Sequence, residues 1–136
     1  MDELPGKECW CGLCGCIETW LSGPALELAW LEQGGDLQPA AEIDRLAATG
    51  NVQAETILRE YEHRLARGLA HIINVLDPEV IVLGGGLSNM QRLYSNVPAL
   101  WEEFIFSDIV RTKLLPPKYG DSSGVRGAAW LGAEQI

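Results

Sequence analysis

All four cysteines of the chain fall in one short stretch, Cys9 to Glu18, which reads Cys-Trp-Cys-Gly-Leu-Cys-Gly-Cys-Ile-Glu. Thiolates at such close spacing can converge on one tetrahedral zinc ion. The two glycines allow the backbone to turn tightly enough to bring the sulfurs together. Helical character begins at the end of this stretch, from Ile17 to Leu21. We therefore expect a metal-binding knuckle that holds the carboxylate of Glu18 rigidly beside the metal.

Clustered cysteines have a second interpretation, because four of them could form two disulfides in more than one connectivity. The N-terminus from Met1 to Pro5 is acidic, whereas a signal peptide would be basic and then apolar. Without an export signal, closely spaced cysteines are more typical of reduced metal ligands than of disulfides. No apolar run approaches the length of a transmembrane helix. The sequence thus predicts a cytoplasmic protein with no membrane partner.

The composition bounds the class of protein. The 136 residues fit a single domain, and 47% hydrophobic with 21% charged residues is typical of a soluble globular protein. The 10 basic and 19 acidic residues give a formal charge of −9, which argues against broad attraction to nucleic-acid phosphates. We expect no nucleic-acid partner. A nucleotide site is still compatible with this charge, because it needs only a few local donors.

Residues typical of helix starts and helix ends divide the first half of the chain into consecutive predicted helices. Ser22-Gly23-Pro24 predicts a helix that ends at Gly34, and a short helix is expected from about Pro39 to Ala48. The longest helix is predicted over Val52 to Leu76, where apolar residues recur at the three-and-four spacing of a buried stripe. The members of this stripe are Ala54, Ile57, Leu58, Tyr61, Leu65, Leu69, Ile72, Ile73 and Leu76.

A strand and a glycine turn follow the long helix. Val80 to Leu83 reads as a short buried strand, and Gly84, Gly85 and Gly86 come next. Ser88, with Gln91 three residues later, is predicted to form a capping box that starts a helix through about Phe106. A glycine turn between a strand and a helix lets backbone N–H groups approach a phosphate. The same glycines are also explained by a tight turn alone.

The last segment predicts a second strand and a final helix. Val110 to Leu115 is expected to be an edge strand, because two prolines end it. The stretch from Gly120 to Ser123 is predicted to cap the final helix, which explains Asp121 and Ser122 without catalysis. Small residues on that helix predict a face that packs closely against another element. They are Gly124, Gly127, Ala128 and Ala129.

Three separated motifs together resemble the signature of the ROK family of sugar kinases and related repressors, and in detail its bacterial fructokinases. They are Cys9 to Leu26, Asn74 to Ser88 and Gly120 to Trp130. The resemblance implies an actin-like, ribonuclease H-like α/β fold of two lobes. Residues 1–136 resemble a partial C-terminal lobe, with a zinc knuckle at 9–18, predominantly helical and with about two strands. The family's N-terminal catalytic lobe, with the phosphate loop and catalytic aspartate, has no counterpart in this sequence.

The resemblance assigns roles by position. It implies that Cys9, Cys11 and Cys16 bind a structural zinc ion and that Glu18 contacts the sugar. Gly84, Gly85 and Gly86 are implied to help bind ATP, and no catalytic residue is expected because the base belongs to the other lobe. The family's fourth zinc ligand is a histidine, and no histidine precedes Cys9 here. Cys14 either replaces that ligand or is an unrelated thiol.

The implied function is that of the C-terminal part of an ATP-dependent hexose kinase. It would use Mg-ATP to phosphorylate a sugar hydroxyl, with fructose favoured, and would be inactive in isolation. One alternative is the sugar-sensing domain of a ROK repressor. Another is a standalone remnant that self-associates through apolar surface. Because two short strands alone make a marginal sheet, we expect either non-native packing or a homo-oligomer that covers the gap.

Overall fold

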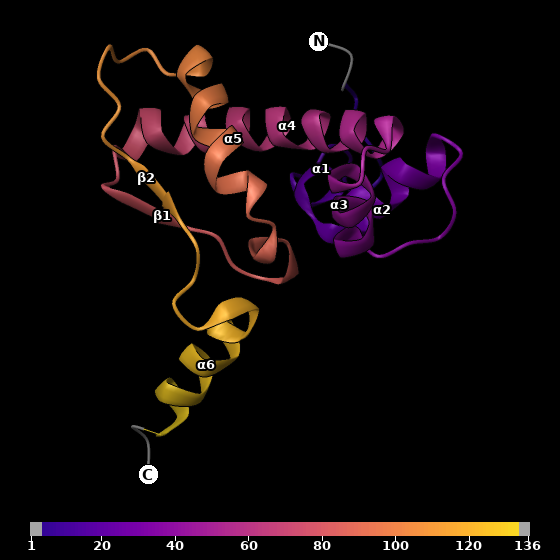
Figure 1. Ribbon diagram of the computed structural model, residues 1–136. Coiled ribbons are helices and arrows are strands. Elements are labelled where there is room, and N and C mark those ends of the chain that lie inside the picture. The colour runs from indigo at the N-terminus through magenta and orange to yellow at the C-terminus, as the bar shows by residue number, and fades with distance from the viewer. Residues whose placement is uncertain (1–3, 134–136) are drawn as a thin grey trace. The chain divides into compact units, whose positions relative to one another are not determined.

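A computed structural model describes residues 4–133 of the chain (Figure 1). These residues form two compact units that divide between Leu65 and Ala66, inside the longest helix. The first unit contains α1 (Glu18–Leu21), α2 (Gly23–Glu32), α3 (Ala40–Ala48) and the first part of α4 (Val52–Leu76). The bounds of the three longer helices agree closely with those predicted from the sequence.

The core of the first unit consists of apolar side chains from α2, α3 and the first part of α4. Its larger buried members include Leu26, Trp30, Ile43, Ile57, Leu58 and Tyr61. The predicted stripe of α4 is therefore confirmed in this unit. No helix that the structure describes is both long enough and apolar enough to cross a membrane.

Polar bonds fix α1, the short helix that carries Glu18. The Ser22 hydroxyl accepts a hydrogen bond from the backbone N–H of Ala25 at 3.1 Å and so caps α2 directly after α1. The Tyr61 hydroxyl of α4 donates to the carbonyl oxygen of Leu21 at 3.1 Å. Burial of Tyr61 raises the pKa of its hydroxyl to about 12, so the hydroxyl keeps its proton at neutral pH. Both bonds hold the chain at the C-terminal end of α1.

Gly35 is required by the position of the Trp30 ring. A Cβ atom at Gly35 would overlap the indole. The ring is held in place because Trp30 is 5% exposed and its Nε1 donates to the carbonyl oxygen of Asp36 at 2.7 Å. We expect Gly35→Ala to lower the free energy of unfolding by about 1–3 kcal/mol, as overpacking typically does. Denaturant unfolding measures this loss.

The matched control is Gly127→Ala. A Cβ at Gly127 meets no described atom within 4 Å, and the backbone there is helical. Alanine also has the higher helix propensity, so this variant should be as stable as the parent or slightly more stable. Equal destabilisation by both substitutions would contradict the proposed steric role of Gly35.

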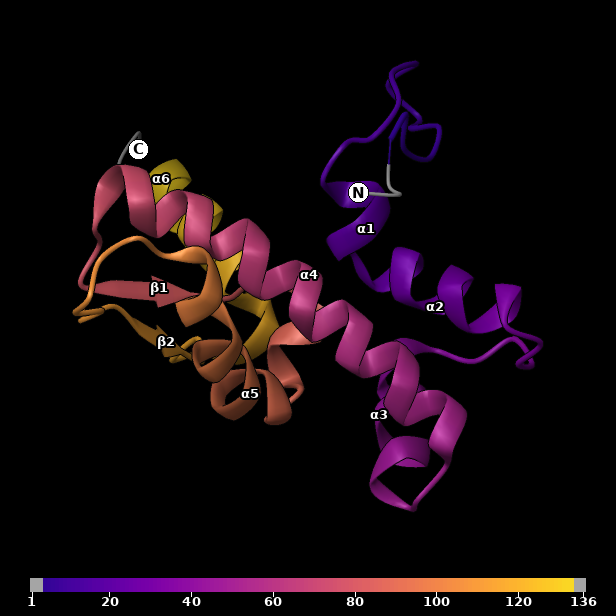
Figure 2. The same ribbon diagram turned by 90° about the horizontal axis from the view of Figure 1, so that it is seen from above.

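The second unit contains the remainder of α4 and a small parallel sheet (Figure 2). Strand β1 (Val80–Val82) pairs with β2 (Lys113–Leu115) in the register Val80↔Lys113 and Val82↔Leu115. Between the strands lie η1 (Gly86–Asn89), α5 (Arg92–Trp101) and η2 (Glu102–Phe104), which make the crossover that a parallel pair needs. The described chain ends with η3 (Gly120–Ser122) and α6 (Ser123–Ala133). A predominantly helical α/β fold with two strands is confirmed.

The prediction that the first strand is buried is wrong for the described part of the chain. Val80 is 44% exposed and Val82 is 56% exposed. Ile72 and Leu76, which were predicted to face inward from α4, are also exposed. The apolar pattern correctly indicated a strand and a helix, but burial depends on neighbours that the described residues do not supply.

The predicted capping box at Ser88 is also wrong. The Ser88 hydroxyl donates to the carbonyl oxygen of Gly85 at 2.6 Å, and α5 begins at Arg92 without a side-chain cap from Gln91. Ser88 is buried, and its own carbonyl oxygen accepts a hydrogen bond from the Tyr94 hydroxyl at 2.6 Å. It therefore closes the glycine turn, because its hydroxyl reaches back along the chain and not forward to the helix.

The small-residue face of α6 lacks the close packing that the sequence predicts. A Cβ at Gly124 or Gly127 would meet no described atom within 4 Å, and Ala128 and Ala129 are exposed. Just before this helix, Asp121 accepts hydrogen bonds from the Asn89 amide at 3.3 Å and from a neighbouring serine hydroxyl. The bond from Asn89 connects η1 to η3.

Candidate functional site

Backbone hydrogen bonds fold the stretch from Cys9 to Glu18 into a knuckle. The N–H of Cys9 donates to the carbonyl oxygen of Leu13 at 2.8 Å, and that of Gly12 donates to Cys9 at 2.9 Å. Gly12 and Gly15 have φ of 84° and 74°, in the left-handed region that favours glycine. The glycines thus allow two tight turns in immediate succession.

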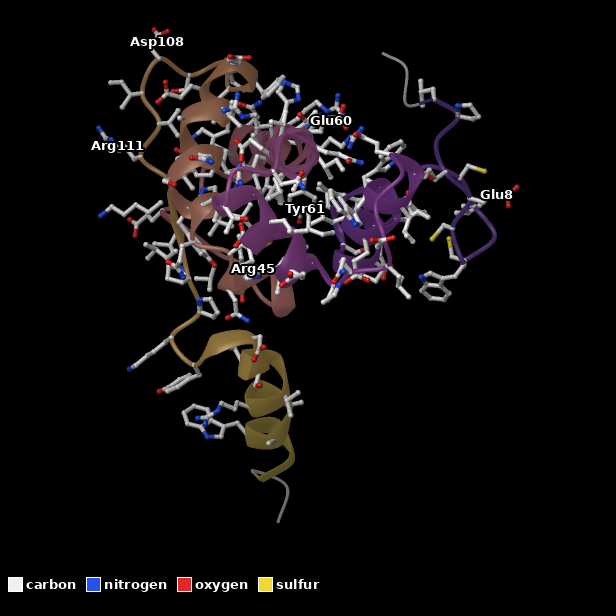
Figure 3. The ribbon with its side chains drawn as sticks, turned by 45° about the vertical axis from the view of Figure 1, so that its right-hand side comes forward. Glu8, Arg45, Glu60, Tyr61, Asp108 and Arg111 are labelled. Atoms are coloured by element: carbon white, nitrogen blue, oxygen red, sulfur yellow. The ribbon has the colours of Figure 1, made fainter. Side chains whose placement is uncertain are left out.

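The knuckle brings the sulfur atoms of Cys9, Cys11 and Cys16 within 4.8 Å of one another. Figure 3 shows sulfur atoms, in yellow, close to Glu8 at the start of this segment. The sulfurs of Cys11 and Cys16 are 3.5 Å apart. Zinc–sulfur bonds of about 2.3 Å place tetrahedral sulfur ligands roughly 3.8 Å apart. The donor type and the spacing of this group therefore fit a zinc ion.

Cys14 lies outside the convergent group. Its backbone pairs with that of Glu8 in an antiparallel bridge, and its side chain is exposed. Among residues 4–133, no other histidine, cysteine or carboxylate joins the three sulfurs. As folded, the knuckle therefore gathers three sulfur atoms, and the sulfur of Cys14 is not among them.

Hydrogen bonding within the group gives its thiols different pKa values. The pKa of Cys16 is raised to about 12, mainly by the hydrogen bond between its thiol and that of Cys11. The pKa of Cys11 is lowered, first by a backbone hydrogen bond from Leu13 and then by the Cys16 thiol. Since zinc binds thiolates, uptake of the metal would release a proton from this pair.

Glu18 is the first residue of α1 and lies beside the knuckle. Its Oε2 accepts a hydrogen bond from Nε1 of Trp10 at 3.2 Å. Both side chains line an open pocket of about 350 Å³, which has a further wall of Pro24, Ala25 and Leu28. That volume falls in the range of small-molecule sites, roughly 300–1,000 Å³. The knuckle therefore presents a carboxylate to a pocket large enough for a small molecule.

Trp10 is the member of this site that the sequence analysis missed. It stands between two candidate metal ligands, and its side chain is 86% exposed. The signal available in the sequence was a large aromatic residue placed between two cysteines that are expected to converge.

The three glycines after β1 lie in the second unit. Gly85 has φ of 75°, so it needs glycine for its backbone conformation. At Gly84 and Gly86 a Cβ would meet no described atom within 4 Å, and both residues are exposed. Contacts within the described chain therefore do not explain the absence of side chains at these two positions.

A family model described as the ROK family matches residues 2–135, so the chain belongs to the ROK family. An N-acetyl-D-glucosamine kinase of Photobacterium profundum is 39% identical over 130 residues, which are 96% of this chain and 43% of that protein. The corresponding kinase of Haemophilus influenzae is 37% identical over 134 residues. The chain spans less than half the length of these relatives.

Solved structures agree with this assignment. A ROK family glucokinase from Streptomyces griseus, in complex with glucose and AMPPNP, superposes with a TM-score of 0.77 and 26% identity. The match covers 93% of this chain and 47% of the glucokinase. A ROK hexokinase from Thermus thermophilus gives a TM-score of 0.75 with 29% identity, over 93% of this chain and 44% of the hexokinase. The fold is thus that of part of a ROK sugar kinase.

Proposed function

We propose that residues 1–136 act as the C-terminal, sugar-contacting lobe of an ATP-dependent hexose kinase whose catalytic lobe lies elsewhere in the functional protein. The observation that carries this proposal is the knuckle, in which Cys9, Cys11 and Cys16 converge while Glu18 faces an open pocket of about 350 Å³. The names of the relatives, which are sugar kinases, support the same function.

In this proposal Glu18 binds the sugar and does not act as the base. An ionised carboxylate accepts hydrogen bonds from sugar hydroxyls, and such charge-assisted bonds are stronger than neutral ones. Zinc held by Cys9, Cys11 and Cys16 would have a structural role, fixing the turn that leads into α1. The residue that removes the hydroxyl proton is assigned to the catalytic lobe.

We assign the nucleotide contact to Gly84, Gly85 and Gly86. Their exposed backbone lets a phosphate or a nucleoside approach without a side chain in the way. Phosphoryl transfer depends mainly on positioning and on stabilisation of charge, with magnesium bridging the phosphates. An exposed glycine turn that binds Mg-ATP supplies part of that positioning.

The proposed substrate is a hexose, and N-acetyl-D-glucosamine is the first to test. Relatives that are 35–39% identical to this chain are named N-acetyl-D-glucosamine kinases, and one of the similar structures contains glucose. The wall of Pro24, Ala25 and Leu28 offers an apolar surface to an acetamido methyl group. Fructose, which the branch resemblance favoured, is the third candidate. Self-association through exposed apolar surface stays a prediction.

A fusion protein tests the proposed function. The part of the Photobacterium profundum kinase that precedes its matched region is joined to the N-terminus of this chain, and the product is assayed for ADP release with Mg-ATP and each sugar. We expect turnover of at least one hexose by the fusion and none by the 136-residue chain alone. A folded, zinc-loaded fusion that phosphorylates none of the three sugars would contradict the proposal.

A further inference from the structure

Trp10 is exposed in a way that the fold does not explain. Its side chain is 86% exposed, so it adds almost nothing to the core, although burial of a large aromatic side chain is strongly favourable. Its indole nevertheless has a defined partner, because Nε1 donates to Oε2 of Glu18 at 3.2 Å. An exposed aromatic ring that is fixed beside a pocket is suited to contact a ligand.

We propose that Trp10 is a positioning and specificity-determining residue for the sugar. Its N–H orients the carboxylate of Glu18, and its ring forms the wall against which the C–H face of a pyranose packs. This inference rests on the proposed function, because it takes the pocket beside Glu18 to be the sugar site.

The positioning role follows from the chemistry of the two side chains. Indole nitrogen is a donor only, whereas an ionised carboxylate is an acceptor only, so this hydrogen bond has one direction. It leaves the second oxygen of Glu18 free of this bond and able to accept from a sugar hydroxyl. A glutamate side chain that is already ordered loses less rotamer entropy when the sugar binds.

The backbone on either side of this hydrogen bond is also held. The N–H of Cys9, next to Trp10, donates to Leu13 at 2.8 Å. Beside Glu18, the hydroxyl of Thr19 donates to the carbonyl oxygen of Cys16 at 2.7 Å. The relative placement of indole and carboxylate is therefore set by the same knuckle that gathers the three sulfurs.

The specificity role follows from the shape of pyranose sugars. In the gluco configuration the ring hydroxyls lie at the edge, which leaves a flat face of C–H groups for an aromatic ring or an aliphatic wall. An axial hydroxyl at C4, as in the galacto configuration, interrupts one such face. The pocket combines the ring of Trp10 with apolar Pro24 and Leu28, and places the Glu18 carboxylate among them. Packing of that face against the ring of Trp10 would favour the gluco over the galacto configuration.

The test uses the full, zinc-loaded chain labelled with ¹⁵N and titrated separately with N-acetyl-D-glucosamine and its C4 epimer, N-acetyl-D-galactosamine. Trp10→Phe keeps a ring but loses the N–H, and we expect it to weaken binding of N-acetyl-D-glucosamine by about tenfold, as loss of a charge-assisted hydrogen bond does. Trp10→Ala removes the ring as well and should also abolish the preference between the epimers. The Trp10 indole resonance should shift with added sugar and in Glu18→Gln.

Trp130→Phe is the matched control. Trp130 is 82% exposed on α6 and does not line the pocket, so this variant should bind both sugars as the parent does. Unchanged affinity and epimer preference in both Trp10 variants would overturn the inference and leave the proposed function intact. Loss of zinc from Trp10→Phe would also overturn it, because Trp10 would then act through the metal. Absence of sugar binding by the zinc-loaded parent would overturn this inference, whereas the proposed function would still be decided by turnover of the fusion protein.

Discussion

Replacement of Cys9, Cys11 or Cys16 by serine is expected to weaken zinc binding by more than about 100-fold. Mutation of residues that only hold the metal ligands in place typically lowers metal affinity 10–100-fold, and loss of a direct ligand should lower it further. The reason is that these three sulfurs lie within 4.8 Å of one another and each would supply a thiolate. A hydroxyl is a much poorer ligand for zinc at neutral pH. Competition with a chromophoric chelator measures the affinity, and native mass spectrometry measures the stoichiometry.

Cys14→Ser is the matched control, because it makes the same atomic change inside the same knuckle. The Cys14 side chain lies outside the convergent group, so the zinc affinity of Cys14→Ser should equal that of the parent. A loss as large as that of Cys11→Ser would show that Cys14 moves into the site when the metal binds. That result would favour the sequence-based alternative in which Cys14 replaces the missing histidine.

Glu18→Gln is expected to lower kcat/KM of the fusion kinase on the order of 100-fold or more, because two hydrogen bonds to a charged acceptor contribute about 1.5–3 kcal/mol each. The change preserves the shape of the side chain but removes its charge and one acceptor. Zinc content should be unchanged, since Glu18 is not among the converging ligands. Initial rates over a range of sugar concentrations separate the effects on kcat and KM.

The control for this prediction removes one negative charge elsewhere. Glu103 is exposed on η2 and does not line the pocket. Glu103→Gln should therefore leave kcat/KM within about twofold of the parent, as expected for screened surface charges. If Glu103→Gln were as impaired as Glu18→Gln, net charge and not a local contact would explain the loss.

Local signals in the sequence predicted the helices well. The long helix was placed at Val52 to Leu76, and these are its bounds in the structure. Its start is fixed by the Asn51 side chain, which accepts a hydrogen bond from the N–H of Ala54, and its end precedes Pro78. Such bounds are predictable because capping and proline chemistry act over a few neighbouring residues.

Burial and long-range bonds were less predictable. A β-branched run such as Val80 to Val82 indicates a strand, but whether that strand is buried depends on segments distant in sequence or outside the described residues. The hydrogen bond from Trp10 to Glu18 depends on the turns at Gly12 and Gly15, which set where the two side chains meet. Spacing alone does not reveal that contact, although it did reveal the cysteine cluster.

The knuckle has a consequence for how ligand preference can evolve. Its shape is set by backbone hydrogen bonds, two left-handed glycines and three sulfurs, whereas the side chains of Trp10 and Leu13 are 86% and 67% exposed. Substitutions at these two positions therefore change the chemistry presented to solvent with little effect on the fold, since exposed sites tolerate change. In the proposed site, selection for a new sugar would therefore act at position 10 while the cysteine cluster and the helices stay as they are.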